Sequence, residues 1–287
     1  TVDGKFFVTA RGWEDLSEIL KSYEELQVEI GEELIGEFLQ KEEIARDFAG
    51  YYRLYEKYKS DYQIQEILDG NVTSRQLKTC CDMGKKASFE ERFTVTEMLL
   101  EAVTERISSF QKTDEKTEKL YGNLKLLKVF LQEKNSVEAM EQFIVSRRKA
   151  LDAKICSELL TAEEAAREEE QIRILEEYFF QLKELHISDV AEGIEQIGER
   201  FGNVCRLRNE KFEETKKMLE QAFSFLEECF GEGQELLLFE TGLTGDDRCS
   251  MFISQYGCPS YFKHCELLLY SKKENEMRKE CRDLLEE

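Results

Sequence analysis

Proline occurs only once in the 287 residues of this chain, at Pro259. Because proline lacks a backbone N–H group and clashes with the preceding turn, it interrupts helices, and its near-absence permits long ones. Apolar residues recur at spacings of three and four along most of the chain, as on one face of a helix. The sequence therefore predicts an all-α protein.

Four short segments with helical periodicity occupy residues 9–70, and Asp69-Gly70-Asn71 ends the last of them. Helices joined by short turns in so short a stretch would form a small four-helix bundle. The segments are 12–26, 31–40, a longer one with Ile44, Phe48, Tyr52 and Tyr55, and a short one with Ile64, Ile67 and Leu68.

Residues 72–235 are expected to form an arm of long, antiparallel, coiled-coil-like helices, because their apolar residues make narrow stripes. Ser136 is expected to cap a helix after a break at Asn135, and Gly193, Gly198 and Gly202 to produce a bend or loop within 187–203. The stripes are Val95, Leu99, Val103, Ile107 and Phe110; Leu120, Leu124, Leu127 and Leu131; Met140 and Ile144; Ile172, Leu175, Phe179, Leu182 and His186; and Phe212, Thr215, Leu219, Ala222, Leu226 and Cys229.

Residues 236–287 are expected to form a short, cysteine-rich helical module. Residues 236–239 lead into an expected turn at 241–245, after which Asp246 and Asp247 begin a helix that Gly257 closes. Pro259 is well placed to start the next helix, and a charged terminal helix follows.

Arg11 lies at the start of the first expected helix, for which Thr9 is a suitable N-cap. A cation there faces the positive end of the helix dipole, where an anion is favoured. The position is explained if an anion binds in front of the helix, held by backbone N–H groups and the guanidinium group. The alternative is a solvated arginine that begins a surface helix.

The segment 9–17, with sequence TARGWEDLS, resembles the start of the C-terminal helical lid of MoxR-type AAA+ ATPases. In that family a Ser/Thr-Pro-Arg tripeptide carries the sensor-2 arginine; Arg11 stands at this arginine, and Ala10 replaces the proline. The resemblance continues through residues 31–34 and the aromatic segment 48–55, so that it covers about residues 1–70. It implies that Arg11 senses nucleotide and that the helical extension transmits motion to a partner.

No phosphate-binding G-x-x-x-x-G-K-[ST] motif and no apolar strand ending in Asp-Glu occurs in the chain. The chain opens at Thr1 without an initiator methionine. We therefore expect the C-terminal fragment of a longer ATPase whose AAA+ core domain binds ATP and Mg²⁺. This fragment should hold no cofactor, contain no catalytic residue and be inactive alone; the parent would form a homo-oligomeric ring that acts on an unidentified protein client.

The formal net charge of −21 argues against nucleic acid and anionic membranes as partners. A local basic patch could still form, but a solvated face is the alternative for its candidate residues. No run of 18 apolar residues suggests a membrane span, and we expect a cytoplasmic protein. The patch candidates are Lys125, Lys128, Arg147, Arg148 and Lys149.

Nine scattered cysteines without a C-x-x-C motif favour reduced thiols over a disulfide framework. Cys249, Cys258, His264 and Cys265 are the only Cys/His cluster, and their spacing is not that of a zinc site, so no metal is expected. A Cys–His nucleophilic pair among them and a Cys80–Cys81 redox pair are alternatives; buried or loop cysteines are the simpler interpretation.

Acidic runs at 163–164 and 168–170 lack the histidine spacing of a di-iron site, and a solvated face is the simpler interpretation. Tyr51, Tyr52, Tyr55 and Tyr58 are more typical of a core stripe than of a base-stacking platform. If the likeness to an ATPase lid is accidental, the alternative function is a non-enzymatic acidic helical scaffold that binds other proteins.

Overall fold

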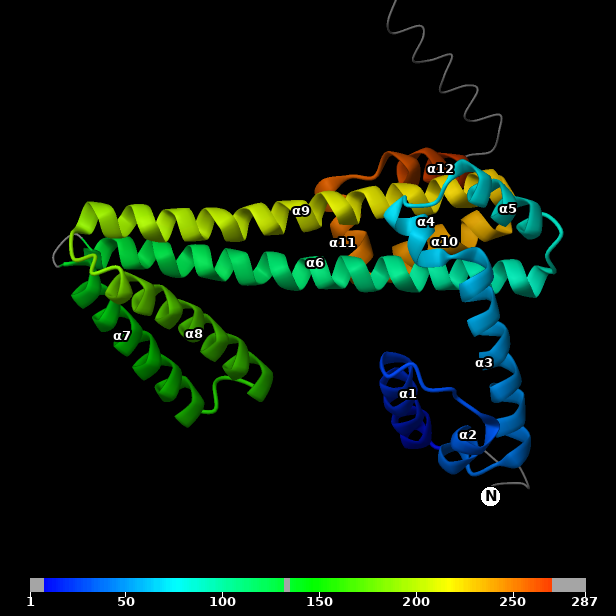
Figure 1. Ribbon diagram of the computed structural model, residues 1–287, viewed down its shortest axis with the longest axis horizontal. Coiled ribbons are helices and arrows are strands. Elements are labelled where there is room, and N and C mark those ends of the chain that lie inside the picture. Colours follow the sequence, from blue (N-terminus) through cyan, green and yellow to red (C-terminus); the bar gives the residue numbers. More distant parts are fainter. Residues whose placement is uncertain (1–7, 132–134, 270–287) are drawn as a thin grey trace, which may run out of the picture. The chain divides into compact units, whose positions relative to one another are not determined.

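The computed structural model describes residues 8–131 and 135–269, and within these ranges the regular structure is helical throughout (Figure 1). The predicted all-α class is thus confirmed. None of the helices in these ranges combines the length and the apolar composition that crossing a membrane requires. The contacts divide the chain into two compact units, residues 1–101 with 221–240, and residues 102–220 with 241–287.

This division differs from the three consecutive segments expected from the sequence. Two very long helices, α6 (Phe89–Leu131) and α9 (Val190–Phe230), contribute residues to both units, as does α10 (Gln234–Gly245). At a rise of about 1.5 Å per residue, the 43 residues of α6 span about 65 Å. The two apolar stripes expected at 95–110 and 120–131 therefore belong to one uninterrupted helix.

In the first unit, α1 (Ala10–Glu25), α2 (Glu32–Leu39) and α3 (Glu42–Tyr62) enclose a small core. Its buried residues are Leu16, Ile35, Leu39, Ala45 and Ala49. The fourth expected helix, α4 (Ile64–Asp69), is present, but its buried Ile64, Ile67 and Leu68 lie outside this cluster. Three of the four expected helices, α1, α2 and α3, thus share this core, and α4 does not contribute to it.

The helix α5 (Ser74–Gly84) follows, and a capping box of Thr73 and Gln76 begins it. Tyr62 at the end of α3 is fully buried, and its hydroxyl group donates a hydrogen bond to Glu91 Oε1 of α6 at 2.8 Å. About two turns earlier in α3, the Tyr55 hydroxyl group donates a hydrogen bond to Glu101 Oε2 at 3.5 Å. These bonds attach α3 to the first turns of α6.

In the second unit, α6 and α9 run side by side and antiparallel (Figure 1). Arg106 of α6 faces Glu214 of α9, and Asp114, two turns further along α6, faces Arg208. The hairpin of α7 (Ser136–Cys156) and α8 (Ala162–Glu184) shares a core with the last turns of the same α6. The predicted α8 stripe is buried at Ile172, Leu175, Phe179 and Leu182.

Four local predictions about this unit are wrong, and two of them concern α7 and α8. Asn135, not Ser136, caps α7; the buried Ser136 instead donates to the Ile187 carbonyl oxygen at 2.9 Å. His186 is exposed with a positive φ of 55° and does not continue the α8 seam, because α8 ends at Glu184.

The bend expected within 187–203 does not occur, because α9 runs through Gly193, Gly198 and Gly202. A helical glycine costs only about 1 kcal/mol, which the packing of a long helix can offset. The turn expected at 241–245 is also wrong, because α10 includes these residues.

The two remaining helices begin as expected. Asp246 caps α11 (Asp247–Tyr256) by accepting hydrogen bonds from the N–H groups of Arg248 and Cys249, and Gly257 ends it at φ 77°. Pro259 begins α12 (Pro259–Leu269). The charged helix expected after α12 lies outside the described residues.

Candidate functional site

Arg11 lies in the first turn of α1, as expected, and Thr9 caps the helix. The Thr9 hydroxyl oxygen accepts a hydrogen bond from the Gly12 N–H at 3.2 Å. The first turn contains no acidic residue. The Arg11 side chain is 87% exposed, and its Nε lies 3.7 Å from the half-exposed Asp15 carboxylate one turn further on. This guanidinium group is thus available to a ligand.

Gly12 explains how the start of α1 is positioned. A Cβ atom at Gly12 would lie 3.1 Å from the Phe38 carbonyl oxygen and 3.2 Å from Val8 Cγ1. Glycine lets the first turn of α1 approach the end of α2 this closely without displacing these neighbours. The glycine after Arg11 therefore positions the start of α1, from which the guanidinium group extends, and no sequence motif indicated this role.

Two further contacts attach α1 to α3, one between aromatic rings and one a hydrogen bond. Trp13 meets Phe48 edge-on, with ring centroids 5.3 Å apart, and Tyr52 donates a hydrogen bond to Glu24 Oε1 at 2.9 Å. Tyr52 is buried, whereas Tyr51 is exposed, so the tyrosine series is only partly a core stripe. Burial and the Glu24 carboxylate raise the pKa of Tyr52, which keeps its donor proton.

A groove of about 760 Å³ lies between the end of α1 and α3, close to this contact. Charged side chains from Glu24, Glu29, Arg53, Glu56 and Lys59 line it, and Arg11 does not. Arg11 therefore lies outside this groove, and its guanidinium group is on the surface of the described part of the unit.

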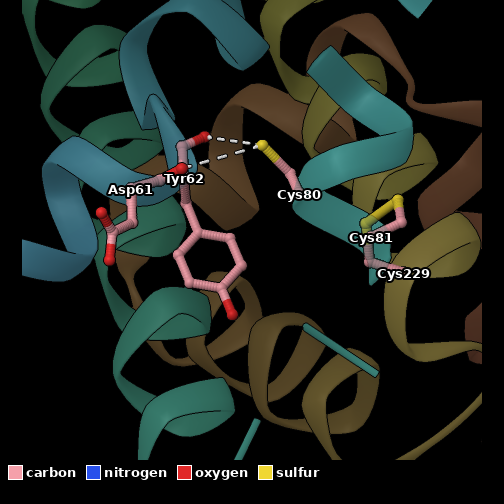
Figure 2. Close-up of a disulfide and its surroundings, with 5 residues drawn as sticks. All are labelled: Asp61, Tyr62, Cys80, Cys81 and Cys229. Carbon is pink, nitrogen blue, oxygen red and sulfur yellow. Dashed lines mark hydrogen bonds between the residues drawn. A yellow bond between two sulfur atoms is a disulfide. The ribbon is translucent and has the colours of Figure 1, made fainter. Parts of the chain in front are cut away.

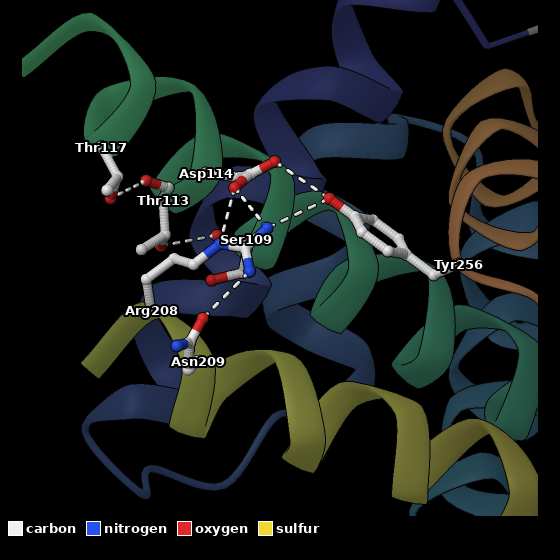
Figure 3. Close-up of polar contacts among 7 residues, drawn as sticks. All are labelled: Ser109, Thr113, Asp114, Thr117, Arg208, Asn209 and Tyr256. Atoms are coloured by element: carbon white, nitrogen blue, oxygen red, sulfur yellow. Dashed lines mark hydrogen bonds and ion pairs between the residues drawn. The ribbon is translucent and has the colours of Figure 1, made fainter. Parts of the chain in front are cut away.

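A second polar site joins α6, α9 and α11 of the second unit (Figure 3). Arg208 Nε lies 2.7 Å from Asp114 Oδ1, and Tyr256 donates to the other oxygen of Asp114 at 3.2 Å. The guanidinium group also stacks on two aromatic rings, 5.1 Å from the Phe110 centroid and 5.6 Å from that of Phe212. This site was not predicted from the sequence, because no local motif connects its three polar residues.

The arginine and the tyrosine of this site both hold their protons more tightly than usual. Burial would lower the pKa of Arg208, but hydrogen bonding and attraction to Asp114 outweigh it and raise the pKa. Burial, followed by the Asp114 charge, raises the pKa of Tyr256. Because arginine and tyrosine both stay protonated and the carboxylate accepts from both, this site holds three helices together.

Cys249 and Cys258 of the C-terminal module do not contact each other through their thiols, and both thiols are protonated. Cys249 donates from Sγ to Thr104 Oγ1 at 3.5 Å, and Cys258 donates to Glu220 Oε1 at 3.3 Å. Burial raises the pKa of each thiol to about 12, far above the range of reactive cysteines. Residues 8–131 and 135–269 present no cluster of three or more metal-binding side chains, and nothing is described of the Cys265 side chain.

One cysteine pair differs from the expectation of reduced thiols. Cys81 of α5 forms a disulfide with Cys229 of α9, 148 residues away, in the first unit (Figure 2). Cys80 is not its partner, although it is the neighbour in sequence. The prediction of reduced cysteines is therefore wrong for this pair, because packing brings together two residues that no motif connects.

The candidate basic patch is neutralised at two of its positions. Arg147 pairs with Glu168 at 3.3 Å and Arg148 donates to Glu176 at 3.1 Å. The acidic runs are likewise engaged, since Glu163 pairs with Arg167, and Glu164 completes a capping box with Thr161. A T-x-x-E pattern at 161–164 was a sequence signal for this cap.

No protein-family model, curated protein or solved structure matches this chain.

Proposed function

We propose that residues 9–69 are the nucleotide-sensing lid of a MoxR-like AAA+ ATPase, and that Arg11 contacts a phosphate of ATP bound with Mg²⁺ in a core domain outside this chain. The observation that carries the proposal is the exposed guanidinium group of Arg11 in the first turn of a capped helix, a turn that contains no acidic residue.

The electrostatics of this helix start favour an anion. A cation in the first turn opposes the helix dipole by about 0.3–1 kcal/mol at an exposed site. The neighbouring Asp15 offsets little of this cost, because exposed i,i+4 ion pairs contribute only about 0.3–0.5 kcal/mol. A phosphate in front of α1 would interact favourably with both the guanidinium group and the first N–H groups of the helix.

The three-helix core supports sensing rather than simple binding. Gly12 holds the start of α1 against α2, and Trp13 packs on Phe48 of α3. A displacement of Arg11 by a phosphate would therefore move α1, α2 and α3 as a body. Tyr55 and Tyr62 connect α3 to α6 through Glu101 and Glu91, and α6 is the route by which the helical extension receives that motion.

The matching experiment is a pair of arginine variants in the intact ATPase. Arg11→Ala should lower ATP turnover at least tenfold with an almost unchanged melting midpoint, because the residue acts on bound phosphate and contributes little to folding. Arg206→Ala is the control, since Arg206 also forms an exposed i,i+4 pair, with Glu210 at 3.8 Å. Wild-type turnover in the Arg11 variant would refute the proposal.

Two simpler measurements bear on the same proposal. The gene that encodes this chain should carry Walker A and Walker B motifs within a few hundred codons upstream of Thr1. The chain by itself should neither hydrolyse Mg-ATP nor bind it with micromolar affinity in a calorimetric titration. The remaining parts of the proposal are a homo-oligomeric ring, a cytoplasmic location and an unidentified protein client.

An acidic helical scaffold is the second candidate function. It is favoured by exposed apolar residues on one side of α6, namely Leu126, Val129 and Phe130, which are a common feature of protein-binding surfaces. An upstream coding sequence without nucleotide-binding motifs would select this function over the first.

A further inference from the structure

The Cys81–Cys229 disulfide lies inside the first unit, where it joins α5 to the last turn of α9 (Figure 2). Cys81 is 6% exposed and Cys229 is 2% exposed. Their Cα atoms are 4.3 Å apart, although 148 residues separate them in sequence. The disulfide therefore closes a very long loop of the chain, and its two cysteines lie in a packed region.

The two helices also pack closely next to the disulfide. A Cβ atom at Gly84, one turn after Cys81, would lie 2.8 Å from Cε1 of Phe230. The ring of Phe230 in turn meets that of Phe225 edge-on, with centroids 6.1 Å apart. Of these features, the approach of Gly84 to Phe230 joins the two helices without involving sulfur, so it keeps α5 beside α9 whether or not the disulfide is formed.

The neighbouring thiol of Cys80 points elsewhere. Figure 2 shows its sulfur directed toward the end of α3, where it donates to the carbonyl oxygens of Tyr62 at 3.7 Å and Asp61 at 3.9 Å. Successive residues on a helix project about 100° apart, so Cys80 and Cys81 face different neighbours. Cys80 is thus not placed to exchange with the disulfide.

We propose that Cys81 and Cys229 form a reversible redox pair, in which oxidation ties α5 to α9 and reduction releases that tie. The oxidant is a low-molecular-weight disulfide such as oxidised glutathione. One cysteine attacks it as the thiolate, forms a mixed disulfide and releases one glutathione thiol. The second cysteine then attacks the protein sulfur of the mixed disulfide and releases the other. Two protein thiols lose two electrons and two protons, and one glutathione disulfide becomes two thiols.

Burial makes this exchange depend on local opening. Glutathione cannot reach the sulfur atoms of cysteine residues that are only 2% and 6% exposed in the closed structure. The helix α5 has only 11 residues, so its separation from α9 is the motion that admits the reagent. Exchange in the native protein should accordingly be slow, and moderate urea should accelerate it.

The test uses the full chain and glutathione buffers of graded reduced-to-oxidised ratio. Peptide mapping after alkylation should show a Cys81–Cys229 linkage that rises and falls with this ratio. The melting midpoint of the unit should be higher in the oxidised protein by at least 5 °C, since a cross-link restricts the unfolded chain. In Cys81→Ser and Cys229→Ser, the difference between oxidised and reduced midpoints should vanish.

Cys80→Ser is the matched control, because it changes an adjacent buried thiol and should keep the full redox-dependent difference. If the serine variants do not fold, the proposal is tested by the wild-type protein alone, through its peptide map and the melting midpoints of its oxidised and reduced forms. The proposal fails if oxidised glutathione produces no Cys81–Cys229 linkage, if Cys80 replaces Cys81 in it, or if reduced glutathione in urea does not break it. Equal midpoints of the oxidised and reduced wild-type protein would also refute it. None of these outcomes depends on the proposed ATPase function.

Discussion

Tyr62, the last residue of α3, is fully buried and donates its hydroxyl proton to Glu91 Oε1 of α6 at 2.8 Å. Tyr62→Phe removes this bond while keeping the ring in place. Because Glu91 is only partly buried and can turn to water, the loss should be about 1–2 kcal/mol of unfolding free energy. Urea unfolding measures it, and Tyr121→Phe, at an exposed tyrosine of α6, should change stability by less than about 0.5 kcal/mol.

Stability should fall at alkaline pH. Burial is the main cause that raises the pKa of Tyr52, Tyr55 and Tyr62 above the ordinary value of 10.0, and nearby glutamates add to it. A folded state that holds its protons more tightly than the unfolded state is stabilised below that value and loses the contribution as pH rises through the folded pKa. Urea unfolding at pH 8 to 11 should show the decline beginning near pH 10, and Tyr62→Phe should reduce its slope. A flat profile in this range would contradict the assigned shifts.

Arg208 should contribute more to stability than an exposed arginine. Its side chain is 21% exposed, pairs with Asp114 and stacks on Phe110 and Phe212. Arg208→Ala should lower the free energy of unfolding by about 2–3 kcal/mol, a value between those for breaking a surface ion pair and a fully buried one. Arg208→Lys should recover less than half of this, because an ammonium group can neither stack nor bind the carboxylate through two nitrogens.

The control for both substitutions is Arg206→Ala, two residues earlier on α9 and largely exposed. It should change the unfolding free energy by less than about 0.5 kcal/mol. Equal effects at positions 206 and 208 would mean that the Asp114 network adds nothing to the stability of the second unit.

Three glycines of α9 should respond differently to alanine. A Cβ at Gly193 would lie 2.5 Å from the Cβ of Ser136, whereas at Gly198 and Gly202 it would meet nothing within 4 Å. Gly193→Ala should therefore destabilise the protein by at least 1 kcal/mol through overpacking. Gly198→Ala and Gly202→Ala should each stabilise it by about 0.5–1 kcal/mol, through the better helix propensity of alanine. Thermal or urea unfolding of the three variants decides the matter, and a stabilising Gly193→Ala would contradict the close approach of α9 to α7.

Local features were predictable from the sequence because their causes are local. The Thr9 cap, the Asp246 cap, the Gly257 end and the Pro259 start each depend on residues within one helical turn. Arg11 could be placed in the first turn of its helix for the same reason. Glycine was a weaker signal: it predicted a bend in α9 and a turn in α10, and in both places the helix continues.

The sequence by itself determined the helical class, several helix starts and the place of Arg11 in the first turn of its helix, since periodicity and capping operate over three to four residues. Only the tertiary structure decided which distant side chains meet. Arg208 and Asp114 are 94 residues apart, Tyr256 and Asp114 are 142, and Cys81 and Cys229 are 148. Such pairs depend on how distant helices pack, and for Arg208 and Asp114 on the register of one long helix against another. A narrow apolar stripe offers similar burial at several registers, and the choice among them comes from packing details such as Gly84 against Phe230 and Gly193 against Ser136.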